Sequence, residues 1–498
     1  MTQRSEDRSP VRLAVYGLLM LVPLAYFVRR YPLRGHLRTS DMGYLSDYGR
    51  PEFILYLGGM AALFVLYLLA LRETRRLPVR RALPVVLGGG TVMTALMSFM
   101  YPATAVDIFV YVARSRIFST YGENPMAVYA RAFEADPFMR ALRGEWSSHP
   151  SPYGPLWNLI AAPITYVADT NLGLALAGFK LLSIASLLAG AVTIAIILRH
   201  TRPQDAATGA LFYLWNPLVI WEVAGNGHND AVMVLPMLLA FLTWSRRRDA
   251  WVLPLLGMAT LIKFGAVLLL PLALVALWRR HDSWAERMRL AVRTGLLSAL
   301  VLLVSLYPFY DLDAIRSSIA DTNMIFVVSP ANMVVHWLRD SYPAEDLKRW
   351  LKAVGWVILG ASMLWHAREV WRNSDLARAS FEVFYVFLII VTTYFQGWYL
   401  IWPLALVALL PWGWPAARMI AWTVGAMAVY SLFIWVRRWW IPDGEVLLRI
   451  GIPVISGASA LLTLAEIISR SNHRRNPASA SRHLEHRQDP VRTPQTGV

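Results

Sequence analysis

The sequence predicts an all-α, polytopic membrane protein: a transmembrane bundle of about 14 helices with a long polar loop early in the chain. Composition is the first reason. Of the 498 residues, 56% are hydrophobic and only 16% are charged, whereas soluble domains carry roughly 25% charged residues. The second reason is length, because many apolar runs extend over about 20 residues, as a helix that crosses a bilayer requires.

The expected helices follow one another along the whole chain. We place them at about 11–29, 52–71, 83–101, 174–198, 206–223, 230–245, 250–263, 264–278, 289–308, 352–371, 380–396, 400–412, 418–436 and 446–468. Several are short for a bilayer, which is tolerated where a helix lines a cavity enclosed by protein. The apolar but short stretch PLWNLIAAPITYVADT, which begins at Pro155, is expected to form a helix along the outer surface.

Arginines cluster between alternate apolar runs and set the expected orientation. The clusters are Arg72, Arg75, Arg76, Arg80 and Arg81; Arg199 and Arg202; Arg246, Arg247 and Arg248; Arg279, Arg280, Arg287 and Arg289; and Arg368 with Arg372. With an even number of helices, all of them share one side with both termini, and the positive-inside rule makes that side the cytoplasm. The net charge of +16 suits such loops and anionic headgroups better than nucleic acid.

Three regions are expected. Residues 1–82 would carry two additional N-terminal helices, residues 83–469 the catalytic bundle, and residues 470–498 a basic, disordered cytoplasmic tail. The loops at about 102–173 and 309–350 would face the outside of the plasma membrane. There is no cysteine, so disulfides and thiolate metal sites are excluded.

Asp107 is the most informative residue, because it opens the first outer loop just past an apolar helix. One interpretation is a solvated, inert carboxylate at a helix end. The sequence DIFVYVARSR instead places Asp107, Tyr111 and Arg114 on one helical face. A carboxylate beside an arginine stays charged, which suits a group that takes a proton.

The motif SPYGPLW at 151–157 predicts a rigid turn, since prolines fix φ and glycine permits a tight bend. The turn is either the start of a surface helix or a platform on which Tyr153 and Trp157 stack against a substrate. His149, just before the motif, is a candidate ligand for a phosphate oxygen or a sugar hydroxyl, although a lone histidine is more often structural.

A second polar motif, GNGHND at 225–230, separates two apolar helices. Helix caps explain much of it, but His228, Asn229 and Asp230 are also candidates for reaching a site mouth. Metal binding is a further alternative for this motif, but a single H-x-D spacing is weak support for it, and no metal ligand is assigned.

Lys263 interrupts about 27 nearly uncharged residues. A lysine in mid-membrane disfavours insertion by about 2.5–3.5 kcal/mol. It either snorkels to the outer headgroups or pairs with a phosphate. Trp398 and Tyr399, in FQGWYLIWP, suit an interfacial aromatic belt, a sugar-stacking surface, or both.

Together these motifs resemble the polyprenol-phosphate-mannose-dependent glycosyltransferases, integral-membrane enzymes of the GT-C fold that extend bacterial α-mannans and lipoglycans. The matching pieces, in order, are DIFVYVARSR, NPMAVY, SPYGPLW, WNPLVIWEVAGNGHNDAVMV, TLIKF and QGWYLIWPL, from about residue 83 to about residue 410. Two helices precede the one before Asp107, which departs from typical members of this fold. There is also no adjacent acidic pair, so a metal-dependent variant is disfavoured.

The resemblance implies an inverting hexosyltransferase, with mannose the expected sugar. A polyprenyl-phosphate donor and a glycan or glycolipid acceptor would be its partners, and no cofactor would take part. Asp107 would be the general base. Tyr111, Arg114, His149, Tyr153, Trp157, His228, Asn229, Asp230, Lys263, Trp398 and Tyr399 would be the substrate-binding residues. The alternatives are a transporter or flippase for lipid-linked saccharides, which should show a symmetric repeat, and a surface-polysaccharide polymerase or ligase.

Overall fold

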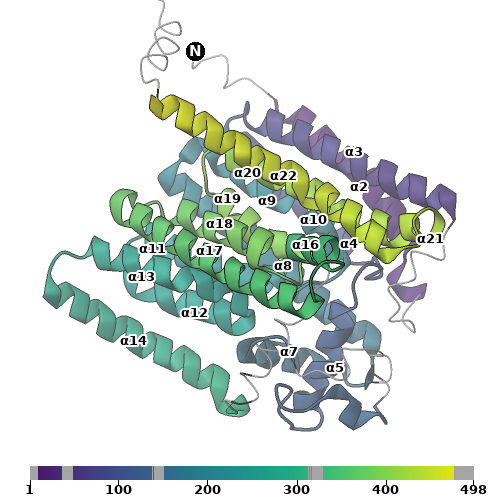
Figure 1. Cartoon of the computed structure of the whole chain (residues 1–498), viewed down its shortest axis with the longest axis horizontal. Coiled ribbons are helices and arrows are strands. Elements are labelled where there is room, and N and C mark those ends of the chain that lie inside the picture. Colours follow the sequence, from purple (N-terminus) through teal and green to yellow (C-terminus); the bar gives the residue numbers. More distant parts are fainter. Residues whose placement is uncertain are drawn as a thin grey trace, which may run out of the picture.

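Helices make up most of the part of the chain that the structure describes. The computed structural model describes residues 9–35, 49–136, 138–139, 151–311, 313, 316 and 329–475. Within these ranges there is no strand, and one isolated antiparallel bridge joins Pro32 to Met100. The predicted all-α bundle is confirmed (Figure 1). The predicted tail beyond residue 475 lies outside the described residues.

The helices follow the predicted order, but some of their ends differ by seven to ten residues, and α16 lies in the segment predicted as the second outer loop. The first half of the chain forms α2 (Val11–Arg30), α3 (Arg50–Thr74), α4 (Val79–Met97), α5 (Asp107–Ser119), α7 (Pro155–Ala168), α8 (Leu172–Thr201), α9 (Ala206–Leu214), α10 (Pro217–Val219) and α11 (Asp230–Ser245). The second half forms α12 (Val252–Ile262), α13 (Leu269–Arg280), α14 (Trp284–Leu306), α16 (Pro330–Leu338), α17 (Ala344–Asn373), α18 (Leu376–Val386), α19 (Ile401–Val407), α20 (Trp414–Tyr430), α21 (Arg437–Trp439) and α22 (Gly444–Arg475).

One predicted helix, 206–223, is divided into two. α9 ends at Leu214, and Asn216 then caps α10 by accepting a hydrogen bond from the Leu218 N–H at 3.0 Å. The break follows from Pro217, which has no N–H to donate and disfavours helical geometry at the residue before it. A π-helical segment then continues α10 from Ile220 to Gly225.

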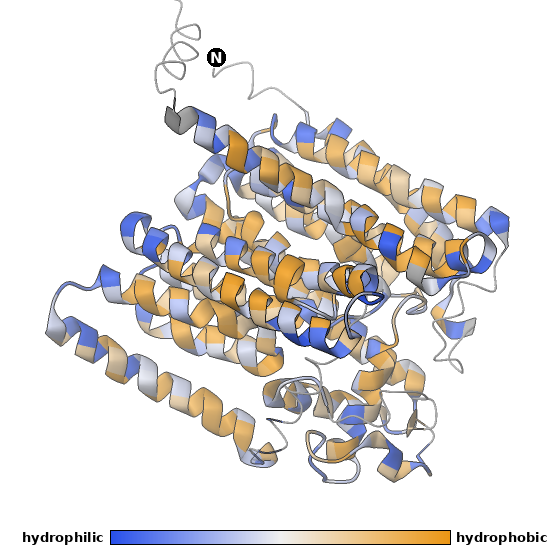
Figure 2. Cartoon of the chain, in the orientation of Figure 1, coloured by the Kyte–Doolittle hydropathy of each residue, from blue (hydrophilic) through white to orange (hydrophobic). Residues whose placement is uncertain are grey.

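Six helices are long and apolar enough to cross a membrane, within the described residues: α2, α3, α8, α14 continued to Phe309, α20 continued to Trp439, and α22 between Val446 and Asn472. Shorter apolar helices cover Asp230–Ser245, Asp249–Ile262 and Gly397–Val407. Every residue of α19 is buried, which explains why a helix of this length is tolerated: protein rather than lipid surrounds it. The protein is therefore a helical membrane protein, and hydrophobic residues make up much of its helices (Figure 2).

The segment predicted as the first long loop is largely helical. α4 ends at Met97, and Asp107 is the first residue of α5, in agreement with the predicted helix that carries Asp107, Tyr111 and Arg114. The segment after Asp107 therefore begins as a helix and not as an open loop. A buried ion pair between Arg116 and Asp136 (2.8 Å) ties α5 to the chain that follows it. The expected surface helix is present as α7, which packs against α5, α8 and α12. The described residues between 102 and 173 are thus packed against the bundle through α5 and α7 rather than arranged as an open loop.

The arginine-rich connections meet at one end of the bundle. Arg280 pairs with Asp249 at 2.6 Å, and Arg279 donates a hydrogen bond to the Ser374 hydroxyl. Arg202 donates to the carbonyl of Leu409. α5 and α7 lie at the lower right of Figure 1, whereas the α13–α14 connection lies at the far left. The basic loops and Asp107 are therefore at opposite ends of the molecule, as the arrangement of arginines predicted.

Candidate active site

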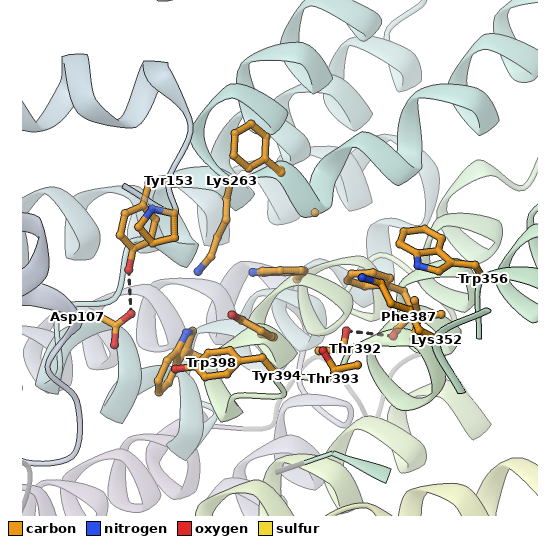
Figure 3. Close-up of a pocket in the computed structure, with 16 residues that line it drawn as sticks. Asp107, Tyr153, Lys263, Lys352, Trp356, Phe387, Thr392, Thr393, Tyr394 and Trp398 are labelled. Carbon is orange, nitrogen blue, oxygen red and sulfur yellow. Dashed lines mark hydrogen bonds between the residues drawn. The ribbon is translucent and has the colours of Figure 1, made fainter. Parts of the chain in front are cut away.

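The Asp107 carboxylate is held by a tyrosine from the SPYGPLW motif. The Tyr153 hydroxyl donates a hydrogen bond of 2.9 Å to Asp107 Oδ1 (Figure 3). Burial, and next the neighbouring Asp107 carboxylate, raise the pKa of Tyr153 well above its usual 10. The phenol therefore stays protonated at neutral pH and remains a donor to the carboxylate.

The Gly154 turn is pressed against the end of α12. Its N–H donates to the carbonyl of Ile262 at 3.1 Å. A Cβ atom at Gly154 would lie 2.1 Å from the carbonyl oxygen of Leu261, so only glycine permits this approach. The next residue, Pro155, starts α7, where a missing N–H does no harm. The turn consequently brings Tyr153 beside Lys263, the residue that follows α12.

Lys263 is buried and paired, not extended toward headgroups. Its extended backbone (φ −148°, ψ 118°) ends α12, and its Nζ lies 2.8 Å from Asp230 Oδ1. The Trp402 indole N–H donates to the same oxygen at 2.6 Å. Nζ also lies 5.1 Å from the centroid of the Tyr399 ring, within cation–π range. The snorkelling interpretation of Lys263 is therefore wrong.

The GNGHND turn places three consecutive polar residues behind the Asp107–Tyr153 pair. Gly227 has φ +79°, a left-handed conformation that favours glycine. The Tyr111 hydroxyl donates to Asn229 Oδ1 at 3.2 Å. The His228 ring stacks on Trp398 with 3.8 Å between centroids. The turn is therefore more than a pair of helix caps, since it supports the aromatic residues around the site.

These side chains surround one pocket with two chemically different ends. The space amounts to about 1060 Å³, some of it open to solvent. Asp107, Tyr153 and Lys263 lie toward one end and Lys352, Trp356 and Phe387 toward the other (Figure 3). The complete lining is Asp107, Pro152, Tyr153, Lys263, Phe264, Gly265, Lys352, Trp356, Phe387, Val391, Thr392, Thr393, Tyr394, Trp398, Tyr399 and Trp402. A carboxylate, two lysines and a mainly aromatic and aliphatic wall thus share one space.

Comparison with known protein families identifies the class of protein to which this pocket belongs. Residues 12–279, more than half of the chain, match the family described as "Alpha-(1->6)-mannopyranosyltransferase, N-terminal domain". The chain belongs to this family. It is therefore an integral-membrane glycosyltransferase, and the resemblance inferred from the motifs is confirmed.

Curated relatives of this mannosyltransferase-family protein agree. Alpha-(1->6)-mannopyranosyltransferase A of Mycobacterium tuberculosis is 26% identical over 401 residues, which cover 76% of this chain and 74% of the relative. Alpha-(1->6)-mannopyranosyltransferase B of Corynebacterium glutamicum is 23% identical over 414 residues, with 76% and 66% covered. The A protein of Corynebacterium glutamicum is 27% identical over 183 residues, or 36% of each chain.

The structure of this glycosyltransferase brings most of the predicted site residues together, in two layers. Asp107, Tyr153, Lys263, Trp398 and Tyr399 line the pocket. A second layer behind them consists of Tyr111, Trp157, His228, Asn229 and Asp230, all of them buried. The Tyr111 ring packs edge-on against both Tyr153 and Trp157.

Two predicted residues are not placed in the pocket. Arg114 is buried in α5 and does not belong to the lining. The carboxylate of Asp107 accepts a hydrogen bond from the Tyr153 hydroxyl, and the role predicted for Arg114 stays a prediction. His149 lies outside the described residues.

Other polar residues of this glycosyltransferase were missed or undervalued. Lys352, Thr392, Thr393 and Tyr394 line the pocket, but they lie in segments whose sequence shows no motif. Lys180 was a detectable signal, as a lone lysine in LALAGFKLLSIAS. It is buried and donates to the carbonyls of Met100, Ala224 and Gly225 at 2.5, 3.1 and 2.5 Å.

Glu222 is buried and contacts several polar side chains rather than a single basic partner. It accepts hydrogen bonds from Tyr430 (2.5 Å) and Asn226 (2.7 Å) and lies 3.3 Å from His228 Nε2. The His228 ring stacks on Trp398, which lines the pocket. The contacts of Glu222 therefore help to hold one wall of the pocket in place.

Proposed function

We propose that this protein transfers mannose from a polyprenyl-phosphate donor to a glycan or glycolipid acceptor on the extracytoplasmic side, with formation of an α-(1→6) linkage. The observation that carries the proposal is the joint lining of one pocket by Asp107, Lys263 and an apolar wall. Family membership supports mannosyl transfer, and the names of the relatives support the linkage.

The composition of the pocket wall favours a lipid-linked donor. Trp356 and Phe387 offer apolar surface at the end away from Asp107 (Figure 3), where a prenyl chain entering from the bilayer would lie. Lys263 and Lys352 line the same space. A phosphate that carries the sugar would bind ammonium groups there through charge-assisted hydrogen bonds.

The reaction we propose is a single in-line displacement. The acceptor hydroxyl oxygen attacks the anomeric carbon as the bond from that carbon to the phosphate oxygen breaks. Asp107 takes the hydroxyl proton, and the polyprenyl phosphate leaves with the electron pair. No general acid is required, because phosphate is a competent leaving group, and Lys263 would stabilise its increased charge. The anomeric configuration inverts.

The side of the membrane is part of the proposal. Basic loops gather at the end of the bundle opposite Asp107, and positively charged loops face the cytoplasm. The pocket would therefore open on the outer side, where a water-exposed glycan meets a donor embedded in lipid.

The test uses purified full-length protein, mannosyl-phosphoryl-polyprenol and an oligomannoside acceptor. We expect Asp107→Asn to lose transfer by roughly 10²- to 10⁴-fold, the usual contribution of a general base, while detergent-purified yield is retained. Glu134→Gln is the matched control, because Glu134 is exposed in the same segment and should leave the rate unchanged. Near-normal activity of Asp107→Asn defeats the role of Asp107, and efficient transfer from a nucleotide-linked mannose without polyprenyl phosphate defeats the donor.

A further inference from the structure

A second pocket lies between α16, α17 and the start of α22, and it shares no lining residue with the first. Its space amounts to about 1130 Å³. Its lining consists of Asn332, Val335, His336, Arg339, Ala344, Lys348, Phe433, Arg437, Gly444 and Leu448. Three side chains of this set are cationic and one is histidine, while none of the described lining residues is a carboxylate. We refer to it as the basic pocket.

Carboxylates near the basic pocket lie at its exposed rim. Asp340 is 3.8 Å from Arg339 and Glu345 is 2.7 Å from Lys348, and the two carboxylate side chains are 81% and 72% exposed. Ion pairs of this kind contribute only about 0–1 kcal/mol. A phosphate that makes several hydrogen bonds at once therefore competes with them effectively. Asp443, the residue before α22, accepts a hydrogen bond from the Val446 N–H at 3.5 Å.

The surroundings of the basic pocket are those of a membrane surface. Trp337, Tyr342, Trp350 and Trp440 are all more than half exposed in the segments that form it. Exposed aromatic rings of this kind concentrate at the level of lipid headgroups. α22 continues as a candidate membrane span from Val446 onward, so the cations lie beside one end of that candidate span, where headgroup phosphates would be expected.

The pocket also offers apolar contacts beside its charges. Val335, Phe433 and Leu448 belong to the lining and would contact the first carbons of an acyl chain. Gly444, another lining residue, starts the long helix α22. The N–H groups of a helix start favour an anion in the same place.

We propose that the basic pocket binds the phosphodiester headgroup of an anionic glycerophospholipid from the outer leaflet. Basic pockets between membrane helices bind such headgroups by the same combination of guanidinium, ammonium and interfacial position. The choice of the outer leaflet rests on the orientation in the proposed function, whereas the binding itself does not depend on the reaction assigned to Asp107.

The basic pocket adjoins the active-site pocket through α17. Lys348 lines the former and Lys352 the latter, and four helical residues span about 6 Å along the axis. A lipid bound at Lys348 therefore lies beside the apolar end of the pocket that contains Asp107, and would form part of its boundary with the bilayer.

The test is lipid binding by the full-length protein in neutral detergent, followed by native mass spectrometry with added phosphatidylglycerol or phosphatidylcholine. We expect phosphatidylglycerol to bind preferentially. The double variant Arg339→Gln/Arg437→Gln should weaken it by roughly 10- to 30-fold, given the contribution of each basic residue near a membrane surface. Both side chains are exposed, and size-exclusion chromatography verifies that the variant is folded.

The matched control is Arg349→Gln/Arg438→Gln. It removes the same charge from residues that adjoin the basic pocket in sequence but do not line it, and it should keep phosphatidylglycerol binding within about 2-fold of wild type. Equal binding of both lipids overturns the proposal, as does equal weakening by the control. Complete displacement of phosphatidylglycerol by millimolar inorganic phosphate shows that the pocket binds phosphate without the lipid, and also overturns it.

Discussion

Asp107 and Tyr153 are 46 positions apart in the chain and share one hydrogen bond. Each residue has a clear signal of its own, since one is a carboxylate near a membrane helix and the other belongs to a proline-bracketed turn. Neither feature of the sequence indicates that the two residues are in contact. Their contact makes Tyr153 a hydrogen-bond donor to the carboxylate, a role that the stacking platform expected of it does not include. We propose that this hydrogen bond orients Asp107 for proton transfer.

Replacing Tyr153 by phenylalanine tests this orienting role. Loss of a hydrogen bond to a charged group removes about 1.5–3 kcal/mol, so kcat should fall roughly 10- to 100-fold. KM for the donor should change little, because the phenyl ring keeps its packing. Tyr166→Phe is the control, since that side chain is 75% exposed on α7. An unchanged kcat in Tyr153→Phe would show that Asp107 needs no such partner.

Variants of the Lys263–Asp230 ion pair distinguish an effect on stability from an effect on catalysis. Either single change, Lys263→Met or Asp230→Asn, leaves a buried charge without its partner (2.8 Å) and should destabilise the protein by about 3–5 kcal/mol. The double variant should regain most of that stability, measured as the thermal midpoint in detergent. It should still fail to transfer mannose, because the cation for the leaving phosphate is absent.

Asp230→Asn alone keeps Lys263 and should retain measurable transfer in the same assay. An active double variant would contradict the role of Lys263 toward phosphate. Equal stability of all variants would contradict the importance of the buried pair.

At the scale of elements, the site depends on where two helices stop. α12 ends at Ile262 and leaves Lys263 in extended geometry, and α7 begins just after Gly154. The two ends touch through the hydrogen bond from the Gly154 N–H to the Ile262 carbonyl (3.1 Å). Broken helices of this kind are tolerated where they line a cavity, and they allow polar groups to face the pocket.

Gly154→Ala tests this contact between elements. The added methyl group would meet the backbone carbonyl of Leu261 at 2.1 Å, and a backbone atom cannot move aside as a side chain can. We expect displacement of Tyr153, loss of most transfer and a lower thermal midpoint. Gly257→Ala in α12 is the control, because nothing lies within 4 Å of its Cβ position. Normal activity of Gly154→Ala would refute a tight turn at this position.

At the scale of the whole molecule, several basic loops lie at the end of the bundle opposite the active-site pocket, although the basic pocket adds a second group of cations beside that pocket. Arg202, Arg279 and Arg280 make contacts between separate loops at one end, while the Asp107 pocket lies at the other. The N-terminal helices belong to the same bundle, since the Tyr67 hydroxyl on α3 donates to the Phe212 carbonyl on α9 at 2.8 Å. The division at residue 82 stays a prediction, and the family match itself begins at residue 12.

The orientation can be measured directly because the chain has no cysteine. A single Glu134→Cys should react with a membrane-impermeant maleimide in intact cells, whereas Arg248→Cys should react only after the membrane is permeabilised. Both positions are exposed, so access to the reagent differs only by the side of the membrane. The reverse labelling pattern would place the pocket on the cytoplasmic side.

The sequence by itself determined the elements of this protein and the residues worth examining. Hydropathy and helical periodicity are local properties, so they predicted the helices, the end that gathers the arginines, and both Asp107 and Lys263. The tertiary structure alone decided the partners: Tyr153 for Asp107, Asp230 for Lys263, and Lys352 for the far end of the pocket. These contacts join residues from different helices, and their distances depend on how the helices pack, which no local pattern in the chain records.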